Sequence, residues 1–448
     1  MKVLFAKIAV RRLFVTISVV AIIELMTGPA GSNSAPVSGF KGSFVESSSF
    51  FGLFRAQRWI VFFGLALIAW VVASFWINQG TQIRSRVRQV IAVPRKATEK
   101  SFVRRGALAA LLFVAIILPH VETAPFWQAA MVEQIAVYVL LAIGLNVVVG
   151  FAGLLDLGFV AFYAIGAYTT AWVTGALPTP ALFHHPLNPF WAIPIAIAIV
   201  MAAGVLLGAP TLRLRGDYLA IVTLGFGEIV TIFANNLYGI TGGSLGTKQI
   251  PHPSLDVGPI KYHWGITPVP YYYLTLVFVV LFIIVFSLLE RSRVGRSWTA
   301  IREDEVAAES VGINPLKYKV MAFAIGAASA GFAGVITASQ LFFIFPSSFT
   351  LLFSINILVL VILGGMGSIA GVVLGAVLIQ TASSYLLHSP PSGYQSQDLY
   401  MYLGALLIVM MIFRPAGLIP SRRRKREIML AEVDHEGHLD EVLGGDDL

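Results

Sequence analysis

The chain has 448 residues, of which 57% are hydrophobic and only 12% are charged. Soluble domains carry about 25% charged residues, so this composition excludes a soluble globular protein and indicates a membrane protein. No cysteine is present, which excludes disulfides, thiolate metal sites and cysteine nucleophiles. The formal net charge of +8 does not indicate nucleic-acid binding, because the basic residues fall in the loops between apolar segments.

Twelve apolar segments follow one another along the chain. A helix that crosses a bilayer needs about 20 residues, and most of these segments reach that length. We therefore expect an all-α, polytopic helical bundle with about 10–12 membrane spans. The segments cover residues 13–30, 58–78, 106–119, 126–149, 156–177, 190–210, 217–235, 270–289, 318–338, 352–364, 367–387 and 399–414.

The positions of Lys and Arg predict a side of the membrane for each loop. If the N-terminus is cytoplasmic and every segment crosses, 26 of the 31 Lys and Arg residues lie on the cytoplasmic side. Short cytoplasmic loops are enriched in these two residues, so we expect both termini in the cytoplasm.

Three regions follow from this topology. Residues 1–105 form an appended N-terminal region with two membrane helices and a basic linker, residues 106–420 form the core, and residues 421–448 form a cytoplasmic charged tail. Residues 1–30 also resemble a signal peptide, although Glu24 within the apolar run argues against that assignment.

The longest charged interruption of the core covers residues 288–320. Its middle, from Trp298 to Val311, has the pattern of one short amphipathic helix that ends at Gly312, since a glycine often follows the last helical residue. Such a helix on the cytoplasmic face predicts a partner that docks there. The alternative is an ordinary surface helix.

Glycine-rich stretches at 144–173 and 360–379 look alike, each with an apolar run, a break and a glycine-spaced helix. This likeness suggests an internal repeat whose broken helices meet near the membrane middle, while the alternative is that the glycines only permit close helix packing. On the first interpretation the translocation path includes the asparagine that follows Leu145, Asn146, together with Gly150, Gly153, Asp156, Glu228, Gly364, Gly365 and Gly367.

Charges inside the apolar segments are costly and therefore are candidates for function. Asp156 and Asp217 lie near the expected cytoplasmic interface, where Arg213 or Arg215 offers a partner. Glu228 lies deeper, either in the path or bonded to a neighbouring helix.

Catalytic signatures are not found in the sequence. The stretch TGGSLGTK lacks the G-K-[ST] ending of a P-loop, and neither H-E-x-x-H nor G-x-S-x-G occurs. We expect a transport subunit rather than an enzyme, with no catalytic residues, metal or cofactor.

Long ordered motifs carry a family resemblance over residues 106–420. The stretches GLNVVVGFAGLLDLGFVAFYAIGAY, PTLRLRGDYLAIVTLGFGEIV, ITGGSLG, AIREDEVAAESVGINPLKYKVMAFAIGAASAGFAGV, LGGMGS and FRPAGLIP resemble the permease subunits of branched-chain amino acid ABC importers, the LivM type. Residues 302–312 then resemble the "EAA" loop of importer permeases, whose coupling helix docks in a cleft of the cytoplasmic ATPase.

The resemblance implies a bacterial inner-membrane permease that acts with partners. These are a second homologous, LivH-like permease, two cytoplasmic ABC ATPase subunits that hydrolyse ATP, and an extracytoplasmic amino-acid-binding protein. It also implies that the residues that couple to the ATPase are Arg302, Glu303, Glu305, Ala307, Ala308, Glu309 and Gly312.

Other functions remain open from the sequence. Close relatives in this class carry urea or short amides instead of Leu, Ile and Val. An ion-coupled secondary transporter is a different class, in which Asp156 and Glu228 would carry protons or Na⁺. A membrane scaffold without transport is the weakest alternative.

Overall fold

The computed structural model describes residues 101–122, 124–181, 185–211, 217–257, 260–388, 398–414 and 416–421. The segments expected at 13–30 and 58–78, and the charged tail beyond residue 421, lie outside these residues. The described residues fall into two compact units, one with residues 101–118 and 398–405 and one with the described residues of 119–388 and 406–421.

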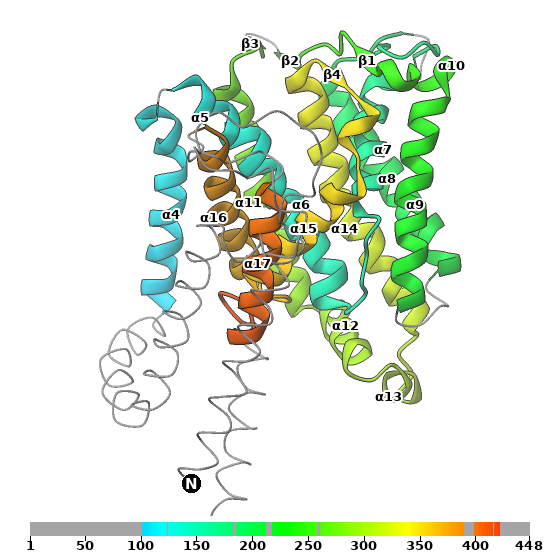
Figure 1. The fold of residues 1–448 in the computed structure, drawn as a ribbon, viewed down its shortest axis with the longest axis vertical. Coiled ribbons are helices and arrows are strands. Elements are labelled where there is room, and N and C mark those ends of the chain that lie inside the picture. Colours follow the sequence, from blue (N-terminus) through cyan, green and yellow to red (C-terminus); the bar gives the residue numbers. More distant parts are fainter. Residues whose placement is uncertain are drawn as a thin grey trace, which may run out of the picture. The chain divides into compact units, whose positions relative to one another are not determined.

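Within the described residues, each apolar span predicted from the sequence forms a helix (Figure 1). The ten apolar segments expected between residues 106 and 414 all appear as helices, so the all-α, polytopic prediction is confirmed. The helices include α4 (Ser101–Val121), α5 (Pro125–Ala130), α6 (Val137–Leu145), α7 (Phe159–Val173), α8 (Pro189–Thr211), α9 (Asp217–Asn236), α10 (Tyr238–Thr241), α11 (Pro268–Arg291), α14 (Pro315–Leu341), α15 (Leu351–Gly364), α16 (Ile369–His388) and α17 (Asp398–Phe413).

Seven helical stretches among the described residues are long and apolar enough to cross a membrane. The first of them runs for 27 residues, Pro125–Phe151, and contains two π-helical turns, one between α5 and α6 and one that follows α6 and ends the span. These turns are η2 (Met131–Ala136) and η3 (Asn146–Phe151). π-helical turns inside α-helices are frequent at functional sites.

Strands are short and lie at one end of the bundle (Figure 1). Two antiparallel pairs occur, β1 (Thr247–Lys248) with β4 (Phe343–Ile344) and β2 (Ser254–Val257) with β3 (Ile260–His263). The opposite end carries α12 (Arg293–Glu303) and α13 (Glu305–Ser310), and α14 runs from α13 to β4.

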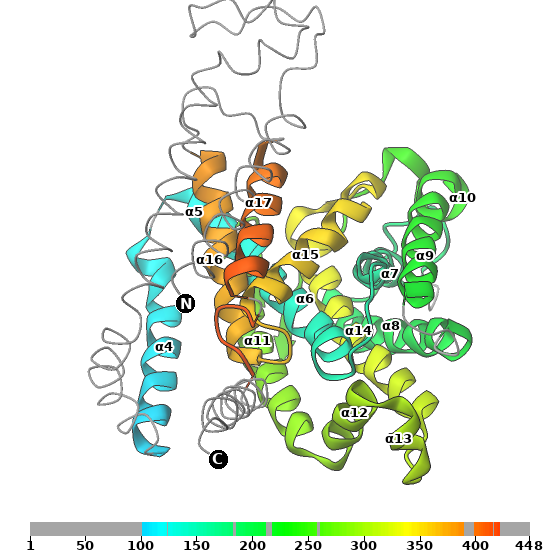
Figure 2. The ribbon, with the colours of Figure 1, turned by 60° about the horizontal axis from the view of Figure 1, so that its bottom comes forward.

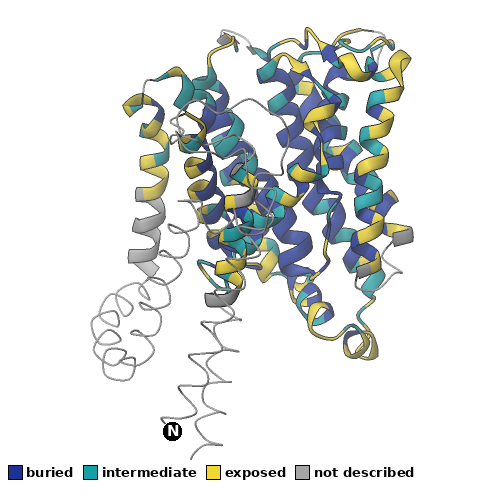
Figure 3. Cartoon of the chain, in the orientation of Figure 1, coloured by how far each residue is buried: buried dark blue, intermediate teal, exposed yellow. Residues whose placement is uncertain are grey.

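The core is built around α14, which packs against α6, α7 and α8 (Figure 2). Small residues make this possible: a Cβ added at Gly166 of α7 would lie 2.5 Å from the Gly331 carbonyl oxygen of α14. Close approach of backbones at small residues is the usual way in which membrane helices associate. Residues of α14 and of the first span are mostly buried, whereas α9 exposes large apolar side chains (Figure 3).

Candidate functional site

The amphipathic segment forms two helices rather than the single helix expected from Trp298 to Val311. Asp304 lies between α12 and α13 with extended backbone, φ −152° and ψ 109°. Its Oδ1 atom accepts hydrogen bonds from the Val306 and Ala307 backbone N–H groups, at 2.9 and 3.0 Å. The expected single helix is therefore wrong, because Asp304 serves as an N-cap that starts a new helix.

Gly312 ends the second helix, as expected. Its φ is +85°, a left-handed conformation that favours glycine. The Gly312 N–H donates to the Glu309 carbonyl at 2.9 Å, and the Ile313 N–H donates to the Ala308 carbonyl at 3.1 Å. These two bonds close the end of α13 and turn the chain toward α14.

Two contacts tie the α12–α13 pair to the start of α14. Trp298 is fully buried, and its Nε1 donates to the Tyr318 carbonyl at 2.7 Å. Lys319 Nζ lies 2.7 Å from Glu305 Oε2, and the Lys319 side chain is only 5% exposed. These contacts attach the α12–α13 pair to the central helix of the bundle.

The expected coupling residues divide into inward and outward groups. Ala308 is buried and Glu305 binds Lys319, so these two face the bundle. Glu303, Ala307 and Glu309 are exposed, and so are the apolar side chains of Val306 and Val311.

Arg302 connects α12 to the end of the first span. Its Nη1 donates to the Gly150 carbonyl in η3, and its aliphatic stem lies against Gly153, whose φ is +73°. A Cβ added at Gly153 would lie 2.6 Å from the Arg302 Cγ. The glycine therefore provides the space in which the arginine stem packs.

The two similar glycine-rich stretches meet at this arginine. Asn146 in η3 is fully buried, and its Oδ1 accepts a 2.8 Å hydrogen bond from the Gly367 N–H, between α15 and α16. A Cβ added at Gly150 would lie 2.5 Å from the Gly367 nitrogen. We define Asn146, Gly150, Gly153, Arg302 and Gly367 as the junction cluster.

The cluster lies at one end of the first span. That span continues without a break to Phe151, so the two stretches meet at its end next to α12. That the broken helices meet near the membrane middle stays a prediction.

Two further glycines of the 360–379 stretch have a different environment. The Gly364 carbonyl accepts the Ile419 N–H at 3.1 Å, and Gly365, with φ +118°, lies against the same returning segment. These glycines hold the chain that follows α17 rather than the junction cluster.

Asp156 lies in the connection between η3 and α7 and is fully buried. Its Oδ1 accepts the Gly158 N–H at 2.9 Å, and within the described residues its Oδ2 has no partner. Burial raises the pKa of Asp156 to about 7, against the opposing effects of the Gly158 N–H and the Thr223 hydroxyl. Arg213, Arg215 and the side chain of Asp217 lie outside the described residues.

Glu228 is not part of the junction cluster. It lies on the exposed side of α9, next to Ile229, which is 50% exposed. A carboxylate that faces lipid is expensive, so this side of α9 is a candidate surface for a protein partner or a polar path.

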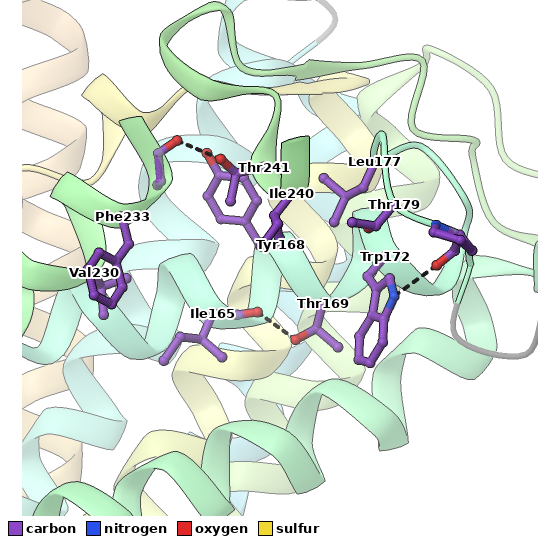
Figure 4. Close-up of a pocket in the computed structure, with 12 residues that line it drawn as sticks. Ile165, Tyr168, Thr169, Trp172, Leu177, Thr179, Val230, Phe233, Ile240 and Thr241 are labelled. Atoms are coloured by element: carbon purple, nitrogen blue, oxygen red, sulfur yellow. Dashed lines mark hydrogen bonds between the residues drawn. The ribbon is translucent and has the colours of Figure 1, made fainter. Parts of the chain in front are cut away.

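A cavity of about 660 Å³ lies between α7, α9 and α10 (Figure 4). Its lining is mostly apolar, with Trp172 and Phe233 among the side chains. The Trp172 indole donates to the Pro180 carbonyl and the Thr241 hydroxyl to the Ala234 carbonyl, so these groups are already satisfied. None of the site residues expected from the sequence lines this cavity.

Polar residues inside the first span were missed by the sequence analysis. Glu133 Oε1 accepts a 3.0 Å hydrogen bond from Gln340 Nε2 of α14, and Gln134 Oε1 accepts one of 2.6 Å from Ser384 Oγ of α16. The signal was present as an acidic and an amide residue in the middle of an apolar segment, which is rare without a function.

Comparison with known proteins places the chain in a family. Residues 129–413 match the family model described as the permease component of branched-chain amino acid transport systems. The LivM permease protein of a high-affinity branched-chain amino acid transport system in Salmonella typhimurium is 41% identical over 73% of this chain and 78% of its own length.

Other relatives agree with this match. The protein of the same name from Escherichia coli K12 is 42% identical over 70% of this chain and 75% of its own length. The LivH permease protein from Escherichia coli K12 is 26% identical over 63% of this chain and 91% of its own length. No solved structure matches the chain. The chain is therefore a multi-pass membrane protein that belongs to the family of permease components of branched-chain amino acid transport systems.

Proposed function

We propose that this chain forms part of the translocation path for Leu, Ile and Val in a binding-protein-dependent ABC importer of the bacterial inner membrane. Family membership and the names of the relatives support the substrate class. ATP is hydrolysed on two separate cytoplasmic subunits, and a second, LivH-like permease completes the path. An extracytoplasmic amino-acid-binding protein delivers the substrate. Both termini lie in the cytoplasm, as the distribution of Lys and Arg predicts.

The observation that carries the mechanism is the position of α12 and α13. The outer face of α13 presents Val306, Ala307 and Glu309 to solvent, and the small and apolar side chains of the first two suit a helix that sits in a cleft of another protein. We assign this outer face to ATPase docking. Glu303 and Gly312 flank it.

Motion of the docked helices reaches the membrane helices through two routes. The Glu305–Lys319 ion pair and the Trp298–Tyr318 hydrogen bond act on α14. Arg302 acts on the end of the first span. Packed helices move as rigid elements. A displacement of α13 therefore moves the ends of the membrane helices that it contacts, rather than being absorbed by local deformation.

The junction cluster is where movement of α12 and α13 would alter the arrangement of the helices that line the path. Asn146 joins the first span to the α15–α16 connection by one hydrogen bond, and Gly150 permits the close approach of the two segments. We assign the junction cluster to the hinge on which the path opens. Asp156 and Glu228 remain candidates for the wall of the path.

Uptake of radiolabelled leucine tests the proposal, in cells that lack the chain and in cells that regain it, with the partner genes intact. We expect uptake to be lost on deletion, restored by the chain and blocked by unlabelled isoleucine and valine. Loss of urea or acetamide uptake on deletion, with unchanged leucine uptake, would show that the importer carries urea or short amides instead of branched-chain amino acids. Uptake that follows an ion gradient and survives ATP depletion would support the secondary transporter instead.

A pair of variants at one position tests the docking face. Val306→Arg places a charge and a longer side chain on the outer face of α13, so we expect uptake to fall to background while the chain stays in the membrane. Val306→Leu keeps the apolar surface and should retain uptake. Equal uptake by both variants would show that this face of α13 does not dock.

A further inference from the structure

A second polar cluster lies at the end of the bundle opposite α12 and α13, where η2 approaches the C-terminal end of α14 (Figure 1). Glu133 is half-buried in the π-helical turn η2, and its Oε1 accepts the Gln340 Nε2 hydrogen bond. Tyr163 of α7 lies close enough for the Glu133 charge to act on its hydroxyl. The coupling mechanism does not use any of these side chains.

Hydrogen-bond acceptors outnumber donors in this cluster. A carboxylate only accepts, so Gln340 turns its Nε2 toward Glu133, and its Oε1 is left to accept from another donor. Gln340 is only 7% exposed, and within the described residues its Oε1 has no partner. Ser339, 1% exposed, has an unpartnered Oγ as well. Buried polar atoms of native proteins are almost always paired, so the Gln340 Oε1 points to a missing donor, and the Ser339 hydroxyl, which can donate or accept, to a missing partner.

The missing donor carries a positive charge if it is to neutralise Glu133 as well. A primary ammonium offers three N–H donors and one positive charge, which matches a carboxylate beside an unpaired amide oxygen. In the part of the chain that the structure describes, Lys319 pairs with Glu305 at the other end of α14. A bound solute with a primary ammonium would supply both the donors and the positive charge.

Aromatic rings pack around Tyr163 and offer an apolar wall on that side. Tyr163 stacks on Phe353 at 5.3 Å and meets Phe349 edge-on at 5.3 Å, while Tyr138 lies 4.9 Å from Phe353. Ligand sites typically combine apolar and aromatic walls with a few polar groups that fix orientation. An aliphatic side chain beside an ammonium group fits this combination.

We propose that Glu133 and the Gln340 Oε1 bind the α-ammonium group of the transported amino acid, with the Tyr138, Tyr163 and Phe353 rings against its aliphatic side chain. This inference rests on the proposed function and narrows its substrate. Urea and short amides carry no ammonium, so the Glu133 carboxylate favours amino acids over these neutral solutes.

Photo-crosslinking tests the site directly. The probe is a leucine analogue with a diazirine in its side chain, added to the purified permease–ATPase complex without the binding protein, so that labelling reports the permease alone. We expect label on peptides that contain η2 or residues 337–353. Excess leucine should remove the label, whereas 4-methylpentanoate, which has the same side chain and carboxylate but no ammonium, should not.

Two variants and one control accompany the probe. Glu133→Gln keeps an amide partner for Gln340 and removes the charge, so we expect labelling to fall at least about tenfold, as the loss of a charge-assisted hydrogen bond predicts. Gln340→Met leaves Glu133 in place and should reduce labelling several-fold. Glu122→Gln removes a carboxylate that caps the Ala124 N–H nearby in the chain and should label like the wild type.

The outcomes separate this inference from the proposed function. A wild-type complex that does not transport leucine when the binding protein is supplied would refute both. A complex that transports leucine but is labelled elsewhere, or is protected equally by leucine and 4-methylpentanoate, would refute the ammonium site alone. The competition result needs no variant, so a Glu133→Gln chain that fails to fold leaves the test decisive.

Discussion

Replacement of Arg302 by methionine is the sharpest perturbation of the junction cluster. Methionine keeps most of the aliphatic stem that packs on Gly153 but cannot donate to the Gly150 carbonyl. Gly150 is buried at the end of the first span, where backbone carbonyls run out of helical N–H donors. The Leu154 N–H, which would bond the Gly150 carbonyl in a continuing α-helix, donates to the Val148 carbonyl instead. The buried carbonyl then loses its charged donor, which costs about 1–3 kcal/mol.

The same free energy sets the expected effect on coupling. If the Arg302–Gly150 bond holds α12 to the first span, its loss shifts the equilibrium between attached and detached arrangements by roughly 5- to 150-fold. We expect the ratio of leucine transported to ATP hydrolysed in proteoliposomes to fall at least fivefold, while ATP hydrolysis continues.

Arg296 is the matched control for this experiment. It lies on α12 and is exposed, and its side chain donates to the Arg291 carbonyl on the surface. Arg296→Met should therefore keep the wild-type transport ratio. Equal ratios for the two variants would refute the assignment of Arg302 as the connection between α12 and the membrane helices.

Three further perturbations test other parts of the structure. Gly150→Ala places a Cβ against the Gly367 connection and should lower the free energy of unfolding by about 1–3 kcal/mol, whereas Gly225→Ala, with nothing within 4 Å, should be close to neutral in thermal unfolding. The Asp156 pKa is about 7 in the folded chain against an ordinary 3.8, so the folded state binds the proton more tightly than the unfolded state. Thermal stability should therefore fall as the pH rises from about 4 to about 7. Asp156→Asn should remove that slope, and an unchanged slope would contradict the assignment. Glu305→Gln leaves the buried Lys319 ammonium unpaired and should lower the unfolding temperature more than the double variant with Lys319→Met, whereas an equal loss in both would argue against the ion pair.

The membrane helices were predictable because length and hydropathy are properties of each segment alone. The segment expected at 126–149 corresponds to the span Pro125–Phe151 in the structure, and the segment expected at 318–338 corresponds to α14. The break at Asp304 was not predicted, because the apolar spacing from Trp298 to Val311 fits one helix and conceals an aspartate that caps a second.

The candidate site was only partly predictable, because its contacts are distant in the sequence. The likeness of the two glycine-rich stretches drew attention to Asn146 and Gly367, but the hydrogen bond between them joins residues 221 positions apart. Neither pattern nor composition indicates that Arg302 completes the cluster. Glu133 escaped notice because the apolar residues around it dominate the hydropathy of the whole segment.

ATP-driven leucine transport by the reconstituted importer tests the central claim most directly. The measurement is accumulation of labelled leucine in proteoliposomes that contain both permeases and the ATPases, with the binding protein supplied. We predict transport that requires ATP, requires this chain, and is lost in Val306→Arg but retained in Val306→Leu. Leucine transport of equal rate without this chain, or without ATP, would contradict the account.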